Sequence, residues 1–88
     1  MTERVFTIQN RLGLHARPAA LFAQEAAKHK CSIMVVKDGL EINGKSVMGL
    51  MLLAAESGSK LTIKVDGVDE DRAIEALAKI FERKFDEQ

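Results

Sequence analysis

The sequence has a single cysteine and a single proline, and its basic and acidic residues cancel. Cys31 has no partner for an internal disulfide, which favours a reducing compartment. With thirteen basic and thirteen acidic residues, the chain lacks the strong positive field of proteins that bind nucleic acid or anionic membranes. No apolar run approaches the roughly 20 residues of a membrane span, and the first residues lack the apolar segment of a signal peptide. We therefore expect a cytoplasmic protein that binds neither nucleic acid nor membrane.

Chain length limits the domain organisation. Eighty-eight residues leave no room for a second hydrophobic core, so a single domain is expected over residues 1–88. The hydrophobic content of 47% supports a packed globule rather than disorder. No internal repeat, linker or low-complexity segment interrupts the chain.

The hydrophobic pattern changes period along the chain and predicts alternating strands and helices. Alternation typical of strands occurs at residues 4–9, 40–43 and 60–66, and the short apolar run within residues 32–37 predicts a further strand. Helical spacing occurs at residues 16–28, 47–53 and about 69–84. The order βαββαβα, with amphipathic helices available to cover one apolar sheet face, predicts a two-layer α+β sandwich.

Apolar residues at regular spacing predict which faces form the core. In the first strand, Phe6 and Ile8 would face the core, and Val5 and Thr7 would face the other side. The first helix would bury Ala19, Phe22, Ala23 and Ala26. The last helix would bury a stripe formed by Ile74, Leu77, Ala78, Phe81 and Phe85.

A loop that ends in a histidine leads directly into the first helix, at Gly13-Leu14-His15-Ala16-Arg17-Pro18-Ala19. Pro18 suits the first turn of a helix, where its missing N–H would have had no partner. His15 then lies at or near the N-cap, facing free N–H groups and the positive end of the helix dipole. That arrangement favours an anion such as phosphate. Arg17 adds a permanent cation with a planar fork of donors.

This heptapeptide resembles the active-site segment of HPr, the histidine-containing phosphocarrier family of the bacterial phosphoenolpyruvate-dependent phosphotransferase system. The resemblance covers essentially the whole chain and includes Asn43-Gly44-Lys45-Ser46-Val47-Met48-Gly49. It implies an open-faced α+β sandwich, with a four-stranded antiparallel sheet and three helices on one face. For an isolated His-x-Arg-Pro we would favour a capping histidine beside a surface arginine, but the whole heptapeptide favours a phosphocarrier.

The resemblance also implies a reaction. His15 would accept a phosphoryl group on Nδ1 from phosphorylated enzyme I and pass it to a histidine of an enzyme IIA domain. Arg17 and the backbone of Ala16 and Arg17 would bind the phosphoryl group. Imidazole suits this role because it is a nucleophile that is neutral near pH 7, and neither a cofactor nor a metal is implied. We therefore expect a monomeric covalent carrier rather than an independent catalyst.

Ser46 has two interpretations. It is a conventional N-cap for the short helix that follows it. It also matches the serine that a dedicated kinase phosphorylates in some relatives, chiefly from low-GC Gram-positive bacteria. A helix N-terminus tolerates the added negative charge, so a serine kinase/phosphorylase acting on Ser46 is a second expected type of partner.

The short second helix cannot bury every apolar side chain it carries. Leu50 and Leu53 form one inward stripe, and the remaining apolar residues lie largely on another side. Exposed apolar residues, adaptable methionines above all, favour a docking surface over a core position. In HPr-like proteins this segment and the first helix form the docking face. The predicted docking face consists of Ala20, Gln24, Val47, Met48 and Met51.

Two other motifs are interpreted as structural. Residues 39–46 satisfy the P-loop pattern G-x-x-x-x-G-K-[ST], but residues 40–43 alternate like a strand where a P-loop needs an open loop. Nucleotide hydrolysis is therefore not expected. His29 and Cys31, together with His15, supply too few metal ligands at a suitable spacing. His29 instead suits the C-terminal end of the first helix, and Cys31 suits a small buried position.

Alternatives of function stay open. Some relatives regulate partners by docking alone, although those typically lack the active-site histidine, and a small ligand-binding domain is a third possibility. The Leu-Met-Leu-Leu run at 50–53 and the ending Phe85-Asp86-Glu87 resemble the nitrogen-related branch of the family, and the sequence leaves open whether the carrier serves that branch or sugar uptake. Leu12 stands where enteric relatives often carry a polar residue, so no side-chain contact from that position is assumed.

Overall fold

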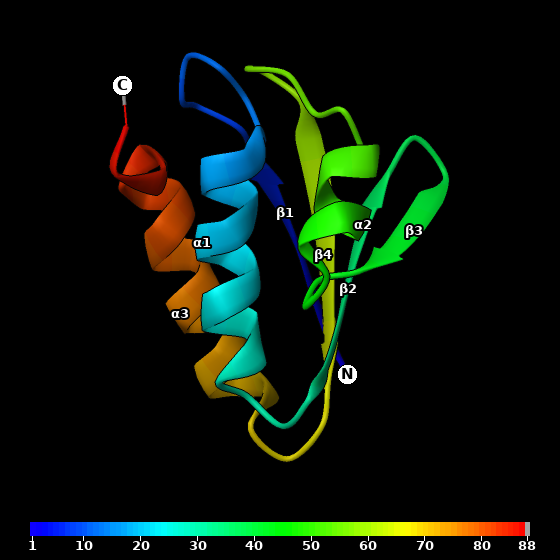
Figure 1. Cartoon of the computed structure of the whole chain (residues 1–88). Helices are drawn as coiled ribbons and strands as arrows, with labels where there is room; N and C mark the ends of the chain where they lie inside the picture. Colours follow the sequence, from blue (N-terminus) through cyan, green and yellow to red (C-terminus); the bar gives the residue numbers. More distant parts are fainter. Residues whose placement is uncertain (88) are drawn as a thin grey trace.

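The computed structural model describes residues 1–87 as one antiparallel sheet covered on one face by helices (Figure 1). The elements along the chain are β1 (Thr2–Thr7), α1 (Ala16–Ala27), β2 (Ser32–Lys37), β3 (Leu40–Asn43), α2 (Val47–Leu52), β4 (Lys60–Asp66), α3 (Glu70–Glu82) and the 3-10 turn η1 (Lys84–Asp86). The strand order is β1-β4-β2-β3, and every neighbouring pair is antiparallel. The predicted α+β open-faced sandwich is confirmed.

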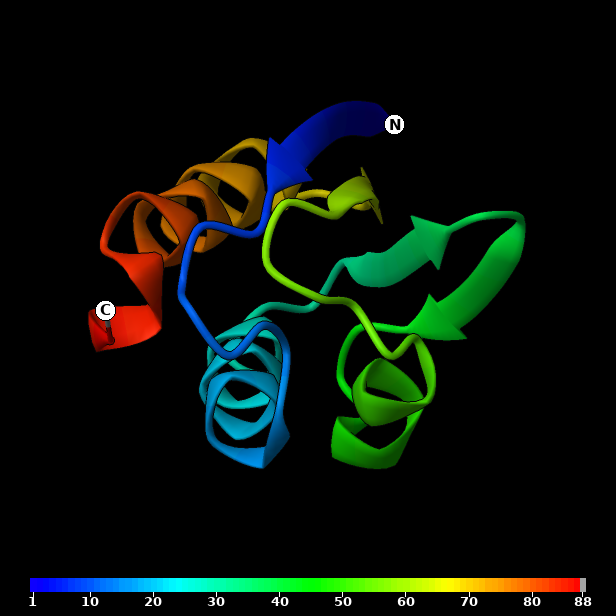
Figure 2. The same ribbon diagram turned by 90° about the horizontal axis from the view of Figure 1, so that it is seen from above.

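The helices form the second layer. Figure 2 shows α1 and α2 side by side, with α3 on the other flank of α1. The sheet buries alternate residues beneath this layer: Leu61, Ile63 and Val65 of β4 are fully buried, and Thr62 and Lys64 between them are more exposed. A side-chain period of two produces this division because successive residues of a strand point to opposite faces. The buried stripe predicted for the first helix is likewise buried.

The first strand lies further toward the N-terminus than predicted. It spans Thr2–Thr7 instead of residues 4–9, although Phe6 and Ile8 face the core as expected. Ile8 lies beyond the strand and is held by two backbone bonds: its N–H donates to the Ser59 carbonyl at 2.8 Å, and its carbonyl accepts from the Gly58 N–H at 2.7 Å. α1 and α2 each end one residue before the predicted position, which is the ordinary uncertainty of a frayed helix end.

The last helix ends earlier than the apolar stripe predicted. α3 stops at Glu82, so Lys84 and Phe85 belong to the separate turn η1. Lys84, Phe85 and Asp86 all have positive φ, between 54° and 59°, which reverses the hand of the backbone. Phe85 is nevertheless 2% exposed and packs edge-on against Phe81, with 5.1 Å between ring centroids. Its burial was predicted correctly, and its place on the last helix was wrong.

The P-loop pattern is occupied by regular structure. Asp38 and Gly39, with φ of 51° and 83°, form the two-residue turn between β2 and β3, as expected of an Asp-Gly hairpin. Leu40–Asn43 is strand β3 itself. These residues therefore offer no open phosphate-binding loop. In residues 1–87, no helix has the length and apolarity to span a bilayer.

Candidate functional site

The loop before α1 is fixed against the segment that follows α2. Gly13 has φ of +73°, and a Cβ there would lie 2.4 Å from the Ala55 carbonyl oxygen. The next residue, Leu14, donates its N–H to the same carbonyl at 2.8 Å. Only glycine combines this backbone conformation with this close approach. Gly13 therefore fixes the path of the loop and, with it, the position of His15 at the end of the loop.

His15 is the N-cap of α1, as the heptapeptide predicts. Its backbone is extended (φ −82°, ψ −171°), its carbonyl accepts from the Ala19 N–H at 3.0 Å, and its side chain makes no cap hydrogen bond. The first N–H groups of a helix have no intrahelical acceptor, and Ala16 and Arg17 are the first two residues of α1. Pro18, at the third helical position, has no N–H to leave unpaired.

Two residues that sequence reasoning missed contact the site: Asn10, from the start of the same loop, and Glu87, from the far end of the described chain. The His15 Nε2 lies 3.0 Å from a carboxylate oxygen of Glu87. The Asn10 side-chain amide donates to the same oxygen at 3.0 Å and to the Gly13 carbonyl at 2.7 Å. The hydrogen bond from His15 lowers the pKa of Glu87, and the positive charge of Arg17 contributes in the same direction. Glu87 stands 72 residues from His15, and no local pattern connects them.

Arg17 lies on the exposed surface of the first turn of α1. It borders an open hollow of about 260 Å³ between α1 and η1. Ala20 and Gln24, predicted for the docking face, line the same hollow together with Phe85 and Asp86. The structure therefore brings the residues predicted on α1 to one surface that begins beside His15.

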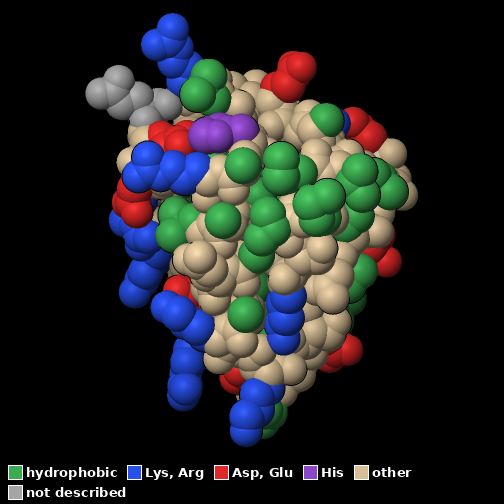
Figure 3. Space-filling model, viewed as in Figure 1, with side chains coloured by type: hydrophobic (Ala, Val, Ile, Leu, Met, Phe, Trp, Pro, Cys, Tyr) green, Lys and Arg blue, Asp and Glu red, His purple; other side chains and the backbone are tan. Residues whose placement is uncertain are grey.

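An apolar surface covers the outer side of α2. Met48 is 72% exposed, and Val47 and Met51 are also exposed, whereas Leu50 and Leu53 are buried as predicted. Figure 3 shows hydrophobic side chains gathered on this face of the molecule, below and beside a histidine. Sequence reasoning did not assign Leu52 of α2 to this surface, although its side chain is 71% exposed.

Ser46 has the capping role expected of it. Its Oγ accepts a hydrogen bond from the Gly49 N–H at 3.0 Å, and its backbone is extended. Its carbonyl accepts from the Leu50 N–H at 3.0 Å. The hydroxyl therefore lies at the N-terminal end of the helix that carries the exposed methionines.

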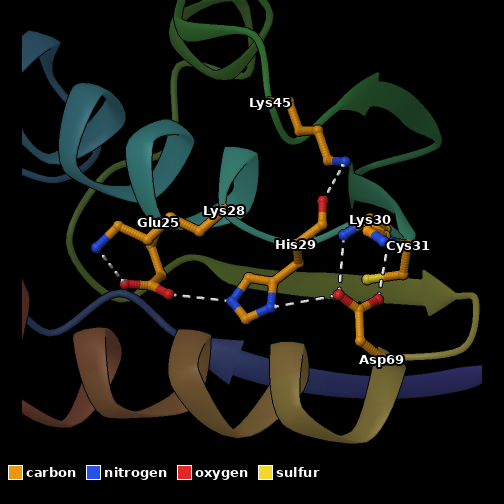
Figure 4. A network of polar contacts seen from close by, with 7 residues as sticks. All are labelled: Glu25, Lys28, His29, Lys30, Cys31, Lys45 and Asp69. Carbon is orange, nitrogen blue, oxygen red and sulfur yellow. Dashed lines mark hydrogen bonds and ion pairs between the residues drawn. The ribbon is translucent and has the colours of Figure 1, made fainter.

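His29 and Cys31 belong to a separate polar network at the opposite end of α1 (Figure 4). The His29 Nε2 lies 3.0 Å from a Glu25 carboxylate oxygen and its Nδ1 3.8 Å from Asp69. Asp69, at the N-cap of α3, accepts from the backbone N–H groups of Lys30 and Cys31 at 2.8 and 2.9 Å. The Lys30 bond is the main cause that lowers the pKa of Asp69.

This network stabilises the fold, because Asp69 joins the loop after α1 to the start of α3. Cys31 is buried, which raises the pKa of its thiol. In the part of the chain that the structure describes, no three His, Cys, Asp or Glu side chains gather as metal ligands. Among residues 1–87, the contacts of His29, Cys31 and Asp69 do not include His15.

Comparisons with known proteins agree with the fold and the loop. The family model described as "PTS HPr component phosphorylation site" matches residues 2–83. The chain is 43% identical over 88 residues, the full length of both, to the phosphocarrier protein HPr of Treponema pallidum. It is 46% identical over 84 residues to the HPr-like protein Crh of Halalkalibacterium halodurans, covering 96% of this chain and 100% of that one.

A solved structure gives the same result for the fold. The crystal structure of HPr-C-His from Thermoanaerobacter tengcongensis is 45% identical and superposes with a TM-score of 0.96, covering 100% of this chain and 99% of that one. The likeness therefore includes the sheet, the three helices and the loop before α1. By sequence and by structure, the chain belongs to the HPr family of phosphocarrier proteins of the phosphotransferase system.

Proposed function

We propose that His15 accepts a phosphoryl group from phosphorylated enzyme I and passes it to a histidine of an enzyme IIA protein. The observation that carries this proposal is the position of His15 at the N-cap of α1, where its side chain makes no cap hydrogen bond. The first N–H groups of a helix lack intrahelical acceptors, so a phosphoryl group on the ring of an N-cap residue would find donors in the first turn. The protein is then a covalent carrier whose chemistry is completed by each partner.

The chemistry needs a site that binds phosphate and also releases it. Backbone N–H groups and the helix dipole favour the anion without a metal ion. Arg17, exposed on the same turn, would add a planar set of donors to the phosphoryl oxygens. No further fixed cation is required, because the partner's own groups would complete stabilisation of the transition state.

The partner must bring its own histidine close to His15, so the docking face should border the His15 loop. The assignment is supported by the hollow that Ala20 and Gln24 share with Arg17 and by the exposed apolar residues of α2, which packs against α1. Exposed methionines suit a surface that binds more than one partner, because their side chains adapt to different shapes. We assign this face to both enzyme I and enzyme IIA. A cytoplasmic location, consistent with the single buried thiol of Cys31, is part of the same proposal.

Regulation at Ser46 is a second candidate function. It is favoured by the similarity to the HPr-like protein Crh and by the position of Ser46 at the edge of the docking face. A phosphate there would add a charge of about −1.5 to −2 at the N-terminus of α2, which the helix tolerates. The same charge would lie beside Met48 and oppose docking of an apolar or acidic partner. The chain would then respond to a serine kinase/phosphorylase as well as to enzyme I.

The decisive experiment is phosphorylation of the purified protein by enzyme I and phosphoenolpyruvate. Intact mass should increase by one phosphoryl group that is lost in acid, as expected of phosphohistidine. His15→Ala should abolish this increase while circular dichroism and the melting temperature stay close to those of the unchanged protein. His29→Ala is the matched control, because His29 lies in the other network, and it should be phosphorylated normally. Uptake of an acid-labile phosphoryl group by His15→Ala would exclude the proposal.

A further inference from the structure

The C-terminal turn of the chain holds an acid against the ring of His15. Of the two ring nitrogens, the structure gives a partner within residues 1–87 to Nε2, which faces the Glu87 carboxylate at 3.0 Å. A carboxylate is an acceptor only, so the proton of a neutral imidazole in this contact lies on Nε2. The other nitrogen, Nδ1, then carries the free lone pair.

The residues just before Glu87 in the chain determine its position. Phe85, two residues earlier, is buried against Phe81. The three residues from Lys84 to Asp86 adopt a left-handed backbone, a conformation that L-residues rarely take three times in succession. Burial of the Phe85 ring stabilises this turn, and the turn directs the chain back toward the start of α1.

Asn10 also holds the Glu87 carboxylate in place. Its side chain is fully buried, and its amide donates both to the Gly13 carbonyl and to the Glu87 oxygen that His15 contacts. One buried amide therefore ties the loop before His15 to the acid beside it. The contact is thus part of a connected set of hydrogen bonds rather than a single surface pair.

We propose that Glu87 is a positioning residue for phosphoryl transfer: its carboxylate holds the proton of His15 on Nε2 and so presents Nδ1 as the nucleophile. This inference rests on the proposed function. In the accepting step, the Nδ1 lone pair forms the N–P bond while the bond from phosphorus to the donor's histidine nitrogen breaks, and that nitrogen keeps the bonding pair. The ring becomes a cation that retains its Nε2 proton. In the donating step the N–P bond breaks and its electron pair returns to Nδ1.

The carboxylate acts in both steps through charge. When the ring is phosphorylated, its positive charge lies beside the negative charge of Glu87, which stabilises the phosphorylated form without any contact to the phosphoryl oxygens. No proton has to move between the two steps. An acid that fixes the tautomer of a histidine and offsets the charge it gains is a general device of histidine chemistry.

Three variants distinguish the effect of the Glu87 hydrogen-bond acceptor from the effect of its negative charge. Glu87→Ala removes the acceptor and the charge. Glu87→Gln keeps an oxygen that accepts from Nε2 and from Asn10 and removes only the charge. Glu82→Ala, at the exposed C-terminal end of α3, is the matched control because it removes one carboxylate from the same end of the chain.

The first measurement needs no phosphoryl donor. In a sample with ¹⁵N-labelled histidine at pH 8.5, well above the ordinary imidazole pKa of about 6.5, the ring nitrogen shifts of His15 report which nitrogen holds the proton. We expect Nε2–H to dominate in the unchanged protein, in Glu87→Gln and in Glu82→Ala. In Glu87→Ala the two nitrogen shifts should move toward each other as the second tautomer becomes populated.

The second measurement is the initial rate of phosphorylation by enzyme I. Partners that hold a metal-binding histidine are worth about 10–100-fold, and we expect Glu87→Ala to be slower by about tenfold, Glu87→Gln to be intermediate and Glu82→Ala to be unchanged. Slow transfer with unchanged ring shifts would overturn the proposal, because Glu87 would then act on docking. Changed shifts with an unchanged rate would overturn it equally. Because the ring shifts are measured without transfer, failure of the phosphocarrier function itself remains distinguishable.

Discussion

The conformation of Gly13 makes the His15 loop sensitive to a single methyl group. In Gly13→Ala the new Cβ would stand 2.4 Å from the Ala55 carbonyl oxygen and 2.9 Å from the Glu56 Cα. Both obstacles are backbone atoms, so neither can move aside as the end of a flexible side chain would. The loop must instead shift away from residues 55–56, and the hydrogen bond from Leu14 to Ala55 must lengthen or break.

The magnitude follows from two contributions. An L-residue in the left-handed region costs about 1–2 kcal/mol. A lost backbone hydrogen bond costs about 0.5–1.5 kcal/mol net. We therefore expect Gly13→Ala to lower the free energy of unfolding by about 1.5–3.5 kcal/mol. In a domain of this size each kcal/mol corresponds to about 4–8 °C, so the melting temperature should fall by roughly 6–28 °C.

Gly58 provides a matched control for backbone conformation. It also has positive φ, +91°, but a Cβ there would meet no atom within 4 Å. Gly58→Ala should therefore show only the left-handed contribution of about 1–2 kcal/mol. Urea denaturation of both variants measures the difference, and phosphorylation by enzyme I should be slowed in Gly13→Ala alone. Equal destabilisation of the two variants would refute the argument that crowding against Ala55 fixes the loop.

Three further predictions concern the site and the fold. Arg17→Lys keeps the charge but loses the planar fork, so stopped-flow transfer to enzyme IIA should slow while the melting temperature is unchanged; unchanged transfer would leave Arg17 an ordinary surface residue. Met48→Glu and Met51→Glu should alter stability by no more than about 0.5 kcal/mol but weaken titrated binding to both partners; a large loss of stability would place these methionines in the core. The hydrogen bond from Thr2, with further bonds, lowers the pKa of Glu70 from 4.5 to about 2. The ionised Glu70 carboxylate therefore stabilises the fold above about pH 4.5, and this stabilisation is lost as the pH falls toward 2. Glu70→Gln should therefore flatten the dependence of melting temperature on pH in that window. An unchanged acid profile in Glu70→Gln would contradict that assignment.

Features that depend on neighbours in the sequence were predictable. The strands at Ser32–Lys37, Leu40–Asn43 and Lys60–Asp66 have the predicted bounds, because alternation and turn residues act within a few positions. The N-cap positions of His15 and Ser46 follow from the residues beside them for the same reason. The exposure of Met48 and Met51 was predictable because a helix this short has a single inward face.

The tertiary structure alone decided which distant groups meet. Asp69 was expected at the start of the last helix and lies there, but its carboxylate accepts from Lys30 and Cys31 instead of capping its own helix. Phe85 has the apolar character of the helix stripe, yet the helix ends before it, because burial against Phe81 outweighs the cost of a left-handed turn. The contact of Glu87 with His15 depends on that turn. The position of Glu87 depends on how the helices pack together, and no local pattern of residues encodes a distance across that packing.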